Sequence, residues 1–445
     1  MRLIPIALGA AVAACSSTTV VVGNLQEVTS LKAIPNRDLD ILFVIDNSPS
    51  MLDKQHSLAE NFPRMMDALA ALPDGLPNLH IGIVTSDLGT SGSHSAPVTG
   101  VGGCIGTGDD GNLVTIAGAS EPYISDVENA SGGRDRNYTG ELRDAFAGAA
   151  LVGDQGCGFE QHLGAMRRAL DNNPRNAGFL RPDANLAVVI LADEDDCSVG
   201  DSSFFGDDTS ALGPLQSFRC FRFGVTCDPD DPTTPGDKAN CKPREDSPYL
   251  DPVQPFADFL TSLKGDERKV MVAGVVGDPA PVSVVLAPPP GGGNASPALA
   301  HSCTFTDASG PAVADPAVRI SAFLDAFPER SRLTSICNAD LSTALDDIGT
   351  SARKLMGDPC LDTTALYDTS DEPGVQPLCE VSDVRDSAPD APTTLPPCTD
   401  GSTTCFDLVA DAAACPNTAD HLRVAIHRAE NPDADAWTHV RCERR

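Results

Sequence analysis

Basic residues, aromatic side chains and long apolar runs are all scarce in this 445-residue chain. Its 31 lysines and arginines face 63 aspartates and glutamates, which gives a formal net charge of -32. Such a surface repels phosphate backbones and anionic lipid headgroups, so we expect no nucleic-acid partner and no electrostatic adsorption to membranes. Hydrophobic residues still make up 41% of the chain, which at this length can build one large domain and a smaller satellite.

The common motifs of hydrolases and nucleotide-binding enzymes are also missing. The chain has no Gly-x-Ser-x-Gly, no P-loop Gly-Lys-Ser/Thr and no His-Glu-x-x-His, which removes the usual starting points for those enzyme classes. A metal-dependent hydrolase would still need a base near its metal, and Glu160 and His162 are the local candidates. Isolated histidines such as His56 and His80 are more often structural. We therefore expect a binding protein and no enzyme.

The N-terminus carries an export signal. Residues 1–14 contain one basic residue, Arg2, and an apolar stretch too short to span a bilayer. The sequence Val-Ala-Ala-Cys that ends at Cys15 resembles the lipobox of bacterial lipoproteins, whose cysteine is lipidated and becomes the first mature residue. Ser16 and Ser17 follow rather than aspartate, which by analogy favours the outer membrane. We expect lipid at Cys15 to be the sole anchor; an ordinary signal peptide with a chance cysteine is the alternative.

Removing Cys15 from the 15 cysteines leaves 14, an even number spread over the mature chain. An exported protein can oxidise all of them, and no Cys-x-x-Cys with a matching second pair suggests zinc. The expected pairs are Cys104 with Cys157, Cys303 with Cys337, two bridges among Cys197, Cys220, Cys227 and Cys241, Cys405 with Cys415, and Cys398 with Cys442; Cys360 and Cys379 complete the set.

The most informative segment is Asp-Ile-Leu-Phe-Val-Ile-Asp-Asn-Ser-Pro-Ser-Met at residues 40–51. Its apolar run suits a central parallel strand, and ligands of open α/β sheets gather beyond the carboxyl ends of such strands. Asp46, Ser48 and Ser50 follow at that end as Asp-x-Ser-x-Ser. One carboxylate and two hydroxyls suit a hard cation and leave coordination positions for water or a partner's carboxylate. The alternative is a plain helix N-cap cluster, with Pro49 fixing the turn.

At these residues the chain resembles the von Willebrand factor type A family. The resemblance implies an α/β fold, with a doubly wound, mostly parallel sheet and helices on both faces. It also implies that Asp46, Ser48 and Ser50 hold Mg²⁺, Mn²⁺ or Ca²⁺, and that an acidic side chain of a protein or peptide ligand completes the coordination shell. The apolar run at residues 187–191 ends in Ala-Asp-Glu-Asp-Asp, where Asp193 matches the family's second carboxylate. A solvated acidic loop is the alternative for that run.

One family element is absent from the sequence. The threonine usually found before the middle helix should fall at residues 156–158, where this chain has Gly-Cys-Gly. Glu160 and Asp87 are possible additional metal ligands, and Asp154 or Thr85 could also fill the vacancy. The sequence leaves this choice open.

The organisation that follows has a signal peptide at residues 1–14, a tether at 15–36 and a type A-like domain at 37–357. Polar insertions at about 88–154 and 198–249 interrupt that domain, and the first is expected to be a long surface excursion. Residues 358–445, rich in cysteine and containing the only tryptophan, predict a small disulfide-stapled β module. The sequence thus predicts a lipid-anchored envelope protein that binds a protein through a divalent cation. The alternatives are a structural envelope protein with a degenerate metal site and, less favoured, a metal-dependent hydrolase.

Overall fold

The structure is a computed structural model that describes residues 25–72, 75–100, 103–288, 293–307, 310–338, 340–371, 373–398, 403–412, 414–415 and 418–445. The predicted signal peptide and Cys15 lie outside the described residues. No helix in the described ranges combines the length and the apolar character needed to cross a membrane.

A seven-stranded sheet forms the centre of the larger domain, in the order β14-β9-β6-β2-β3-β4-β5. Neighbouring strands from β14 to β3 are parallel, and β4 and β5 continue the sheet as antiparallel edge strands. The strands are β2 (Asp38–Ile45), β3 (Asn78–Thr85), β4 (Ile124–Glu128), β5 (Arg134–Arg136), β6 (Asn185–Leu191), β9 (Val270–Val276) and β14 (Ser331–Ser335).

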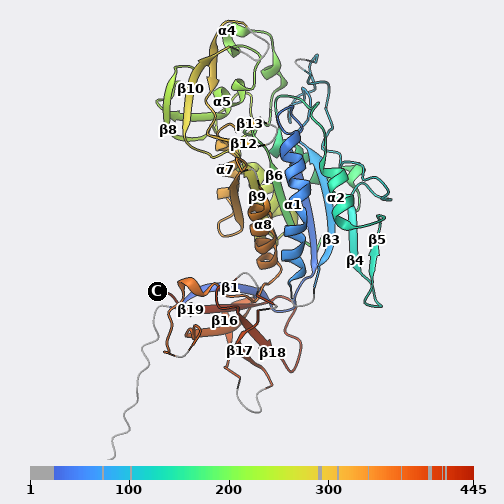
Figure 1. Cartoon of the computed structure of the whole chain (residues 1–445), viewed down its shortest axis with the longest axis vertical. Coiled ribbons are helices and arrows are strands. Elements are labelled where there is room, and N and C mark those ends of the chain that lie inside the picture. Colours follow the sequence, from blue (N-terminus) through green and yellow to red (C-terminus); the bar gives the residue numbers. More distant parts are fainter. Residues whose placement is uncertain are drawn as a thin grey trace, which may run out of the picture.

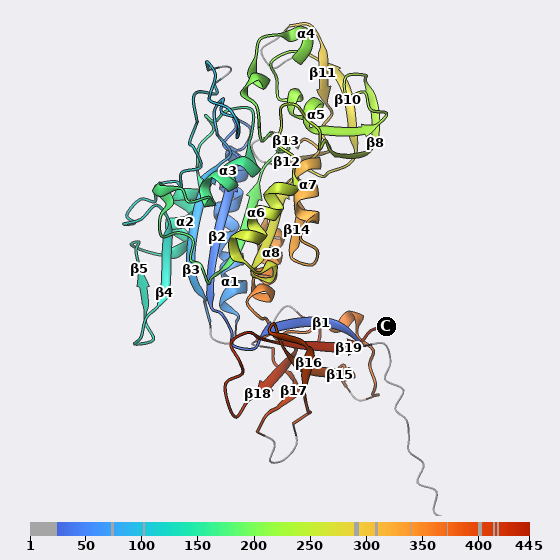
Figure 2. The same cartoon turned by 180° about the vertical axis from the view of Figure 1, so that it is seen from behind.

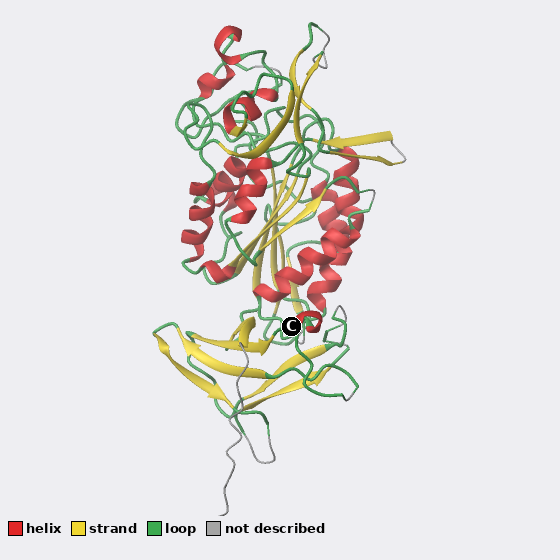
Figure 3. Ribbon diagram, turned by 90° about the vertical axis from the view of Figure 1, so that its left-hand side faces the viewer, coloured by secondary structure: helices red, strands yellow, loops and turns green. Residues whose placement is uncertain are grey.

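Helices cover both faces of this sheet (Figure 3). One face packs against α1 (Leu52–Ala70), α2 (Leu142–Ala150) and α8 (Ser342–Leu355), the other against α3 (His162–Leu170), α6 (Gln254–Lys264) and α7 (Val318–Asp325). Successive residues of β2 serve opposite faces: Phe43 lies in the first core, and Leu42 and Val44 lie in the second. Burial on both faces explains why the central strands are continuous apolar runs without alternation. The protein is therefore a mixed α/β protein.

The expected surface excursion at residues 88–154 is instead partly built into the domain. Its β4 pairs with β3, and its α2 packs on α1, where the ring centroids of Phe146 and Phe62 are 3.7 Å apart. Phe146 also contacts Phe43 of β2. The buried residues of α2 (Phe146, Ala149 and Ala150) follow helical spacing, but the helix has only nine residues among glycines and polar residues, and sequence analysis overlooked it.

The insertion at residues 198–249 builds a second, smaller sheet above the carboxyl ends of the central strands (Figures 1 and 2). Its strand order is β11-β10-β8-β7, so the insertion pairs with strands that come later in the chain. A separate hairpin, β12-β13, lies next to it. The elements of this region are η2 (Ser202–Phe205), α4 (Thr209–Leu212), α5 (Phe218–Gly224), β7 (Val225–Asp228), β8 (Gly236–Pro243), β10 (Val282–Ala287), β11 (Ser296–Leu299), β12 (Cys303–Asp307) and β13 (Gly310–Ala314).

The cysteine-rich C-terminal module lies at the opposite end of the larger domain (Figures 1 and 2). It contains a four-stranded sheet, β1-β19-β15-β16, and the hairpin β17-β18. Part of the expected N-terminal tether belongs to this sheet, because residues 25–32 form β1 and pair antiparallel with β19. The module is made of β1 (Leu25–Lys32), η4 (Thr363–Ala365), β15 (Cys379–Arg385), β16 (Ala388–Leu395), β17 (Cys405–Ala410), β18 (Leu422–His427) and β19 (Ala436–Glu443). The short helices η1 (Pro174–Asn176) and η3 (Glu267–Lys269) belong to the larger domain.

All 14 cysteines among the described residues are paired. Two bridges named for the larger domain, Cys104–Cys157 and Cys303–Cys337, are confirmed. The two bridges expected among the other four cysteines are Cys197–Cys220 and Cys227–Cys241. The two bridges predicted for the module, Cys405 with Cys415 and Cys398 with Cys442, are wrong. The actual bridges are Cys360–Cys415, Cys379–Cys442 and Cys398–Cys405.

The physical reason for this error is strand order. Strand β15 lies beside β19, and their register sets Cys379 directly opposite Cys442, although the two are 63 residues apart. Sequence proximity cannot reveal such a pairing, because strands far apart in the chain become neighbours only in the folded sheet.

Non-reducing peptide mapping of the natively expressed protein should recover these seven bridges. Replacing both Cys379 and Cys442 by serine should lower the free energy of unfolding of the module by about 2–5 kcal/mol, because the bridge closes a long loop. Denaturant unfolding measures this change. A majority of free thiols would contradict both the pairing and the export prediction.

Candidate functional site

The site lies where β2 and β6 end side by side. Ile45 and Leu191 are partners in the parallel register, and the backbone N–H of Asp46 donates to the carbonyl of Leu191 at 3.0 Å. Asp46 and Asp193 follow these strand ends, and both are buried. Strand register therefore places the two predicted carboxylates at the same edge of the sheet, the edge covered by the insertion sheet.

Hydrogen bonds connect the four predicted ligand residues. The N–H of Ser48 donates to Asp46 Oδ1 at 2.7 Å, which turns the chain back toward the carboxylate. The hydroxyl oxygens of Ser48 and Ser50 are 3.1 Å apart, and Ser50 Oγ donates to Asp193 Oδ1 at 3.1 Å. Ser50 is exposed, so the site reaches solvent at this residue. The structure brings together all four residues that the sequence predicts.

One carboxylate oxygen at the centre of the site has no partner. Asp46 Oδ2 is buried and accepts no hydrogen bond from any described residue. The position of Asp46 is nevertheless well defined, because Gln55 Nε2 donates to its carbonyl at 3.0 Å and to the carbonyl of Gly153 at 2.8 Å. A buried, unsatisfied carboxylate oxygen is costly unless a cation or a proton binds it.

A second pair of carboxyl groups lies behind the first. Glu160, just before α3, and Glu194, next to Asp193, lie close enough for their charges to interact. Glu160 is buried, and its Oε1 has no hydrogen-bond partner among the described residues. Sequence analysis proposed Glu160 as an additional ligand but overlooked Glu194; its position within the acidic run was the available signal.

Burial and mutual repulsion raise the pKa values of these four carboxyl groups. Burial, followed by the charge of Asp193, raises the pKa of Asp46 to about 7. Burial also raises the pKa of Asp193, raises that of Glu160 well above its ordinary value and raises that of Glu194 to about 8. Carboxylates so close together need a compensating positive charge to stay ionised at neutral pH.

Lys54, which sequence analysis missed, supplies part of that charge. Its buried ammonium lies 3.2 Å from Asp193 Oδ2 and donates to the carbonyl of Ser50 at 2.9 Å. Lys54 lies in the first turn of α1, four residues after Ser50, so the helix itself directs it back toward the motif. One ammonium cannot neutralise four carboxyl groups, and it contacts only Asp193 among them within the described residues.

Buried His162 lies next to Asp46. Its Nε2 is 3.9 Å from Asp46 Oδ2, and neither ring nitrogen has a hydrogen-bond partner among the described residues. Burial lowers the pKa of His162 to about 4, so the ring is neutral at physiological pH.

The structure distinguishes three of the four candidates for the vacancy that the absent threonine leaves. The two carboxylate oxygens of Asp87 accept from the N–H groups of Gly89 and Cys157. Thr85 Oγ1 donates to Asp109. Among the proposed substitutes, Glu160 is the one whose charge acts on Asp46.

The Gly-Cys-Gly segment leaves different amounts of space at its three positions. A Cβ on Gly156 would lie 2.2 Å from Asn47 Oδ1, so the Asn47 side chain would have to shift to accommodate it. Cys157 is bonded to Cys104. Gly158 has space, since a Cβ there would come no closer than 3.9 Å to Glu160 Oε1.

The residues of the acidic run at 193–196 make two different sets of contacts. Asp193 and Glu194 face the site, whereas Asp195 accepts from the N–H groups of Arg319 and Ile320 at the start of α7. Asp196 forms a buried ion pair with Arg319 at 3.0 Å. The solvated-loop alternative is therefore wrong for the buried residues of this run.

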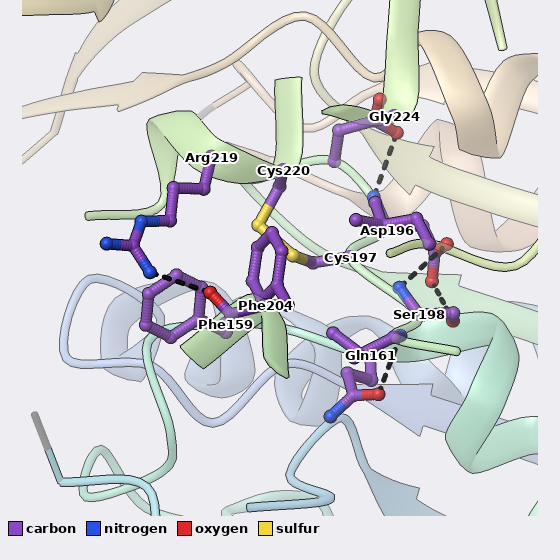
Figure 4. Close-up of a disulfide and its surroundings, with 12 residues drawn as sticks. Phe159, Gln161, Asp196, Cys197, Ser198, Phe204, Arg219, Cys220 and Gly224 are labelled. Atoms are coloured by element: carbon purple, nitrogen blue, oxygen red, sulfur yellow. Dashed lines mark hydrogen bonds between the residues drawn. A yellow bond between two sulfur atoms is a disulfide. The ribbon is translucent and has the colours of Figure 1, made fainter. Parts of the chain in front are cut away.

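A disulfide secures the chain immediately after the run. Figure 4 shows Cys197 bonded to Cys220 of α5, with the Phe159 and Phe204 rings beside it. The N–H of Cys197 donates to the carbonyl of Glu160 at 2.7 Å. The bridge therefore holds the segment carrying Glu160 against both the acidic run and the insertion.

The donors fit a hard divalent cation. They are carboxylate and hydroxyl oxygens, the ligand type that Mg²⁺, Mn²⁺ and Ca²⁺ prefer. Two other groups of potential ligands in the described residues, around Cys360 and Cys415 and around Cys398, are unsuitable because these cysteines form disulfides.

Comparison with known proteins adds little. No protein-family model matches the chain, and no curated protein matches it. Among solved structures, the pilus adhesin SpaC from Lactobacillus rhamnosus GG has a TM-score of 0.30 at 10% identity, covering 93% of this chain and 40% of that chain. A von Willebrand factor type A protein from Catenulispora acidiphila has a TM-score of 0.26 at 10% identity, covering 91% and 58%. The pilus adhesin RrgA from Streptococcus pneumoniae has a TM-score of 0.27 at 10% identity, covering 94% and 58%.

This chain thus spans about half the length of the solved structures that it resembles. TM-scores this low carry no argument about function, so any functional assignment depends on the geometry of the site.

The two glycines of the Gly-Cys-Gly segment should respond differently to substitution. Gly156→Ala should lower the free energy of unfolding by about 1–3 kcal/mol, because its methyl group overlaps Asn47. Gly158→Ala is the matched control and should change stability by less than about 1 kcal/mol. Denaturant unfolding of both variants checks this, and equal effects would contradict the stated packing.

In a chelator, the protein should lose stability as the pH rises from about 5 to about 8. Asp46 and Glu194 titrate at about 7 and about 8 when folded and near 4 when unfolded, so between these limits the folded protein binds more protons. Unfolding then becomes easier with rising pH, by up to about 1.4 kcal/mol per pH unit for each group. Denaturant midpoints at several pH values measure the slope, which the Asp46→Asn and Glu194→Gln double variant should flatten. A wild-type midpoint that rises over this interval would refute the prediction.

Proposed function

We propose that this protein is a cell-envelope protein of the von Willebrand factor type A kind that captures a protein or peptide ligand through a bound divalent cation. The observation that carries the proposal is the pair of buried carboxylates, Asp46 and Asp193, on adjacent parallel strand ends, with two serine hydroxyls between them and Asp46 Oδ2 unsatisfied. The order of the parallel strands and the helices on both faces support assignment to a doubly wound sheet.

In this proposal Asp46, Ser48, Ser50 and Asp193 hold the cation, and Glu160 is the additional ligand. The bound cation would be a Lewis acid with an open coordination position, which a carboxylate of the partner can occupy. The protein residues fix the cation's position and keep most of the surrounding carboxylates out of solvent. Exposed Ser50 marks the side from which the partner approaches.

The proposed action is binding without catalysis. A general base works best when its pKa is near the working pH. Burial lowers the pKa of His162, whose imidazole lies beside Asp46, to about 4, and the whole side chain is buried. It would therefore be a weak base for activating water.

The compartment is proposed from the cysteines and the N-terminus. Seven disulfides are typical of a protein that matures outside the cytosol. The lipobox-like residues before Cys15 suggest attachment to the outer membrane by lipid.

A structural envelope protein with a degenerate site is the second candidate, and Lys54 favours it. Its ammonium lies within 3.2 Å of Asp193 Oδ2, where it competes with a divalent cation for the same charge. In that case the Lys54 ammonium would permanently neutralise the charge of Asp193, and no metal ion would bind.

Calorimetry with Mg²⁺, Mn²⁺ and Ca²⁺ distinguishes the two candidates. Asp46→Asn keeps the acceptor for the Ser48 N–H but removes a charge, so divalent affinity should fall at least about tenfold, or about 1.4 kcal/mol. Asp67→Ala, an exposed acidic residue farther along α1, is the control and should bind as wild type does. Lys54→Gln should raise the affinity because it removes the competing ammonium. If neither wild type nor Lys54→Gln binds a divalent cation, the cation site is refuted and the structural candidate is supported.

Cys15→Ser should release the protein from the membrane fraction, because lipid is the proposed sole anchor. Fractionation, with mass spectrometry of the N-terminal peptide, measures this. An unmodified N-terminal peptide in wild type, with the variant still in the membrane fraction, would rule out the lipid anchor.

A further inference from the structure

A second cavity adjoins the proposed cation site on its insertion side. Its volume is about 230 Å³, and Glu160 and Glu194 line it together with residues of the insertion sheet. The other lining residues that matter here are Phe218 and Phe221 of α5 and Leu299 of β11. The central sheet alone could not form this cavity, because three of these five residues belong to the insertion and to β11.

The two parts of the cavity differ in character. Phe218, Phe221 and Leu299 form apolar walls, and Glu160 and Glu194 form an acidic end. Glu160 is almost completely buried and its Oε1 has no hydrogen-bond partner among the described residues, so a carboxylate oxygen here is available to a ligand. The disulfide between Cys197 and Cys220 secures α5, so the aromatic wall has a fixed position relative to the acidic end.

The charge around the cavity favours a cation. His301 is the one basic residue among those lining it, and its Nδ1 is 2.8 Å from Asp315 Oδ1, another lining carboxylate. Lys54 contacts Asp193 instead. A basic ligand would stabilise the ionised forms of Glu160 and Glu194, which burial disfavours, whereas an anionic or purely apolar ligand would not.

We propose that this cavity receives a basic side chain, lysine or arginine, from the protein or peptide partner. The apolar stem of such a side chain packs along Phe218, Phe221 and Leu299, and its charged end reaches Glu160 and Glu194. Aromatic walls also attract an organic cation. A hydrated divalent ion would gain nothing from these apolar walls.

The partner's contact segment would then carry both signs of charge: a carboxylate for the divalent cation and a basic residue for the cavity. This inference rests on the proposed function for the identity of the partner as a protein, whereas the cavity itself can be tested alone. The protein's charge of -32 would also attract a basic segment over a distance.

The test uses the full chain in chelator, with Nα-acetyl-lysine methylamide and its arginine and norleucine analogues as probes. Saturation-transfer NMR should show the lysine or arginine probe binding at least about tenfold more tightly than norleucine, which has the stem but no charge. Leu299→Trp fills the cavity away from the metal ligands and should weaken the basic probe at least about tenfold, while Mg²⁺ affinity measured by calorimetry stays unchanged. Leu333 of β14 is exposed, so Leu333→Trp is the matched control and should bind all probes as wild type does.

Glu194→Gln removes one charge from the acidic end without adding volume, so it should also weaken the basic probes if Leu299→Trp fails to fold. Equal binding of norleucine and the basic probes would overturn the inference, as would wild-type affinity in both variants. If Asp46→Asn leaves Mg²⁺ binding unchanged but Leu299→Trp still blocks the lysine probe, the cation site fails and the cavity proposal stands.

Discussion

Two carboxylates buried at one edge of a sheet repel each other, and the structure around Asp46 and Asp193 is organised by that repulsion. The parallel register of β2 and β6 brings them together, because Asp46 comes one residue and Asp193 two residues after paired strand ends. Glu160 and Glu194 add to the negative charge, and Lys54 offsets only part of it. Such an arrangement persists when a cation or protons occupy it, and it is costly when neither does.

The rest of the domain holds these charges in place. Asp195 and Asp196 belong to the same acidic run but have their own partners. Asp195 accepts from the backbone at the start of α7, and Asp196 forms an ion pair with Arg319. These contacts fix the backbone that carries Asp193. Two disulfides, Cys104–Cys157 and Cys197–Cys220, secure the segment before Glu160 and the segment after the run. Covalent links of this kind prevent the loops from moving apart to relieve the repulsion.

The insertions change what the site can recognise. In an unembellished α/β domain the strand ends would face open solvent, whereas here α5 and β11 rise beside them and enclose a cavity next to the carboxylates. The C-terminal module lies at the far end, and it incorporates β1 from the beginning of the described chain. The segment nearest the proposed lipid anchor is therefore at the end opposite the site, which is consistent with a site directed away from the membrane.

The sequence by itself determined the features that depend on local pattern. Continuous apolar runs identified β2 and β6, because strands buried on both faces need apolar residues at every position. The Asp-x-Ser-x-Ser spacing and the acidic run identified Asp46, Ser48, Ser50 and Asp193, since residues that follow parallel strands meet at one edge. Sequence analysis named the Cys104–Cys157 and Cys303–Cys337 bridges correctly, whereas only the structure decided the pairing among Cys197, Cys220, Cys227 and Cys241.

Only the tertiary structure decided what depends on distant segments meeting. The place of β1 beside β19, and hence the Cys379–Cys442 bridge, follows from strand order across the whole chain. The packing of Phe146 on Phe62, the approach of Lys54 to Asp193 and the assembly of the cavity from Glu160, Phe218 and Leu299 are likewise contacts between residues with no shared periodicity. No local pattern encodes them, because the energy that selects these contacts comes from burying side chains together, and that burial exists only once the chain has folded.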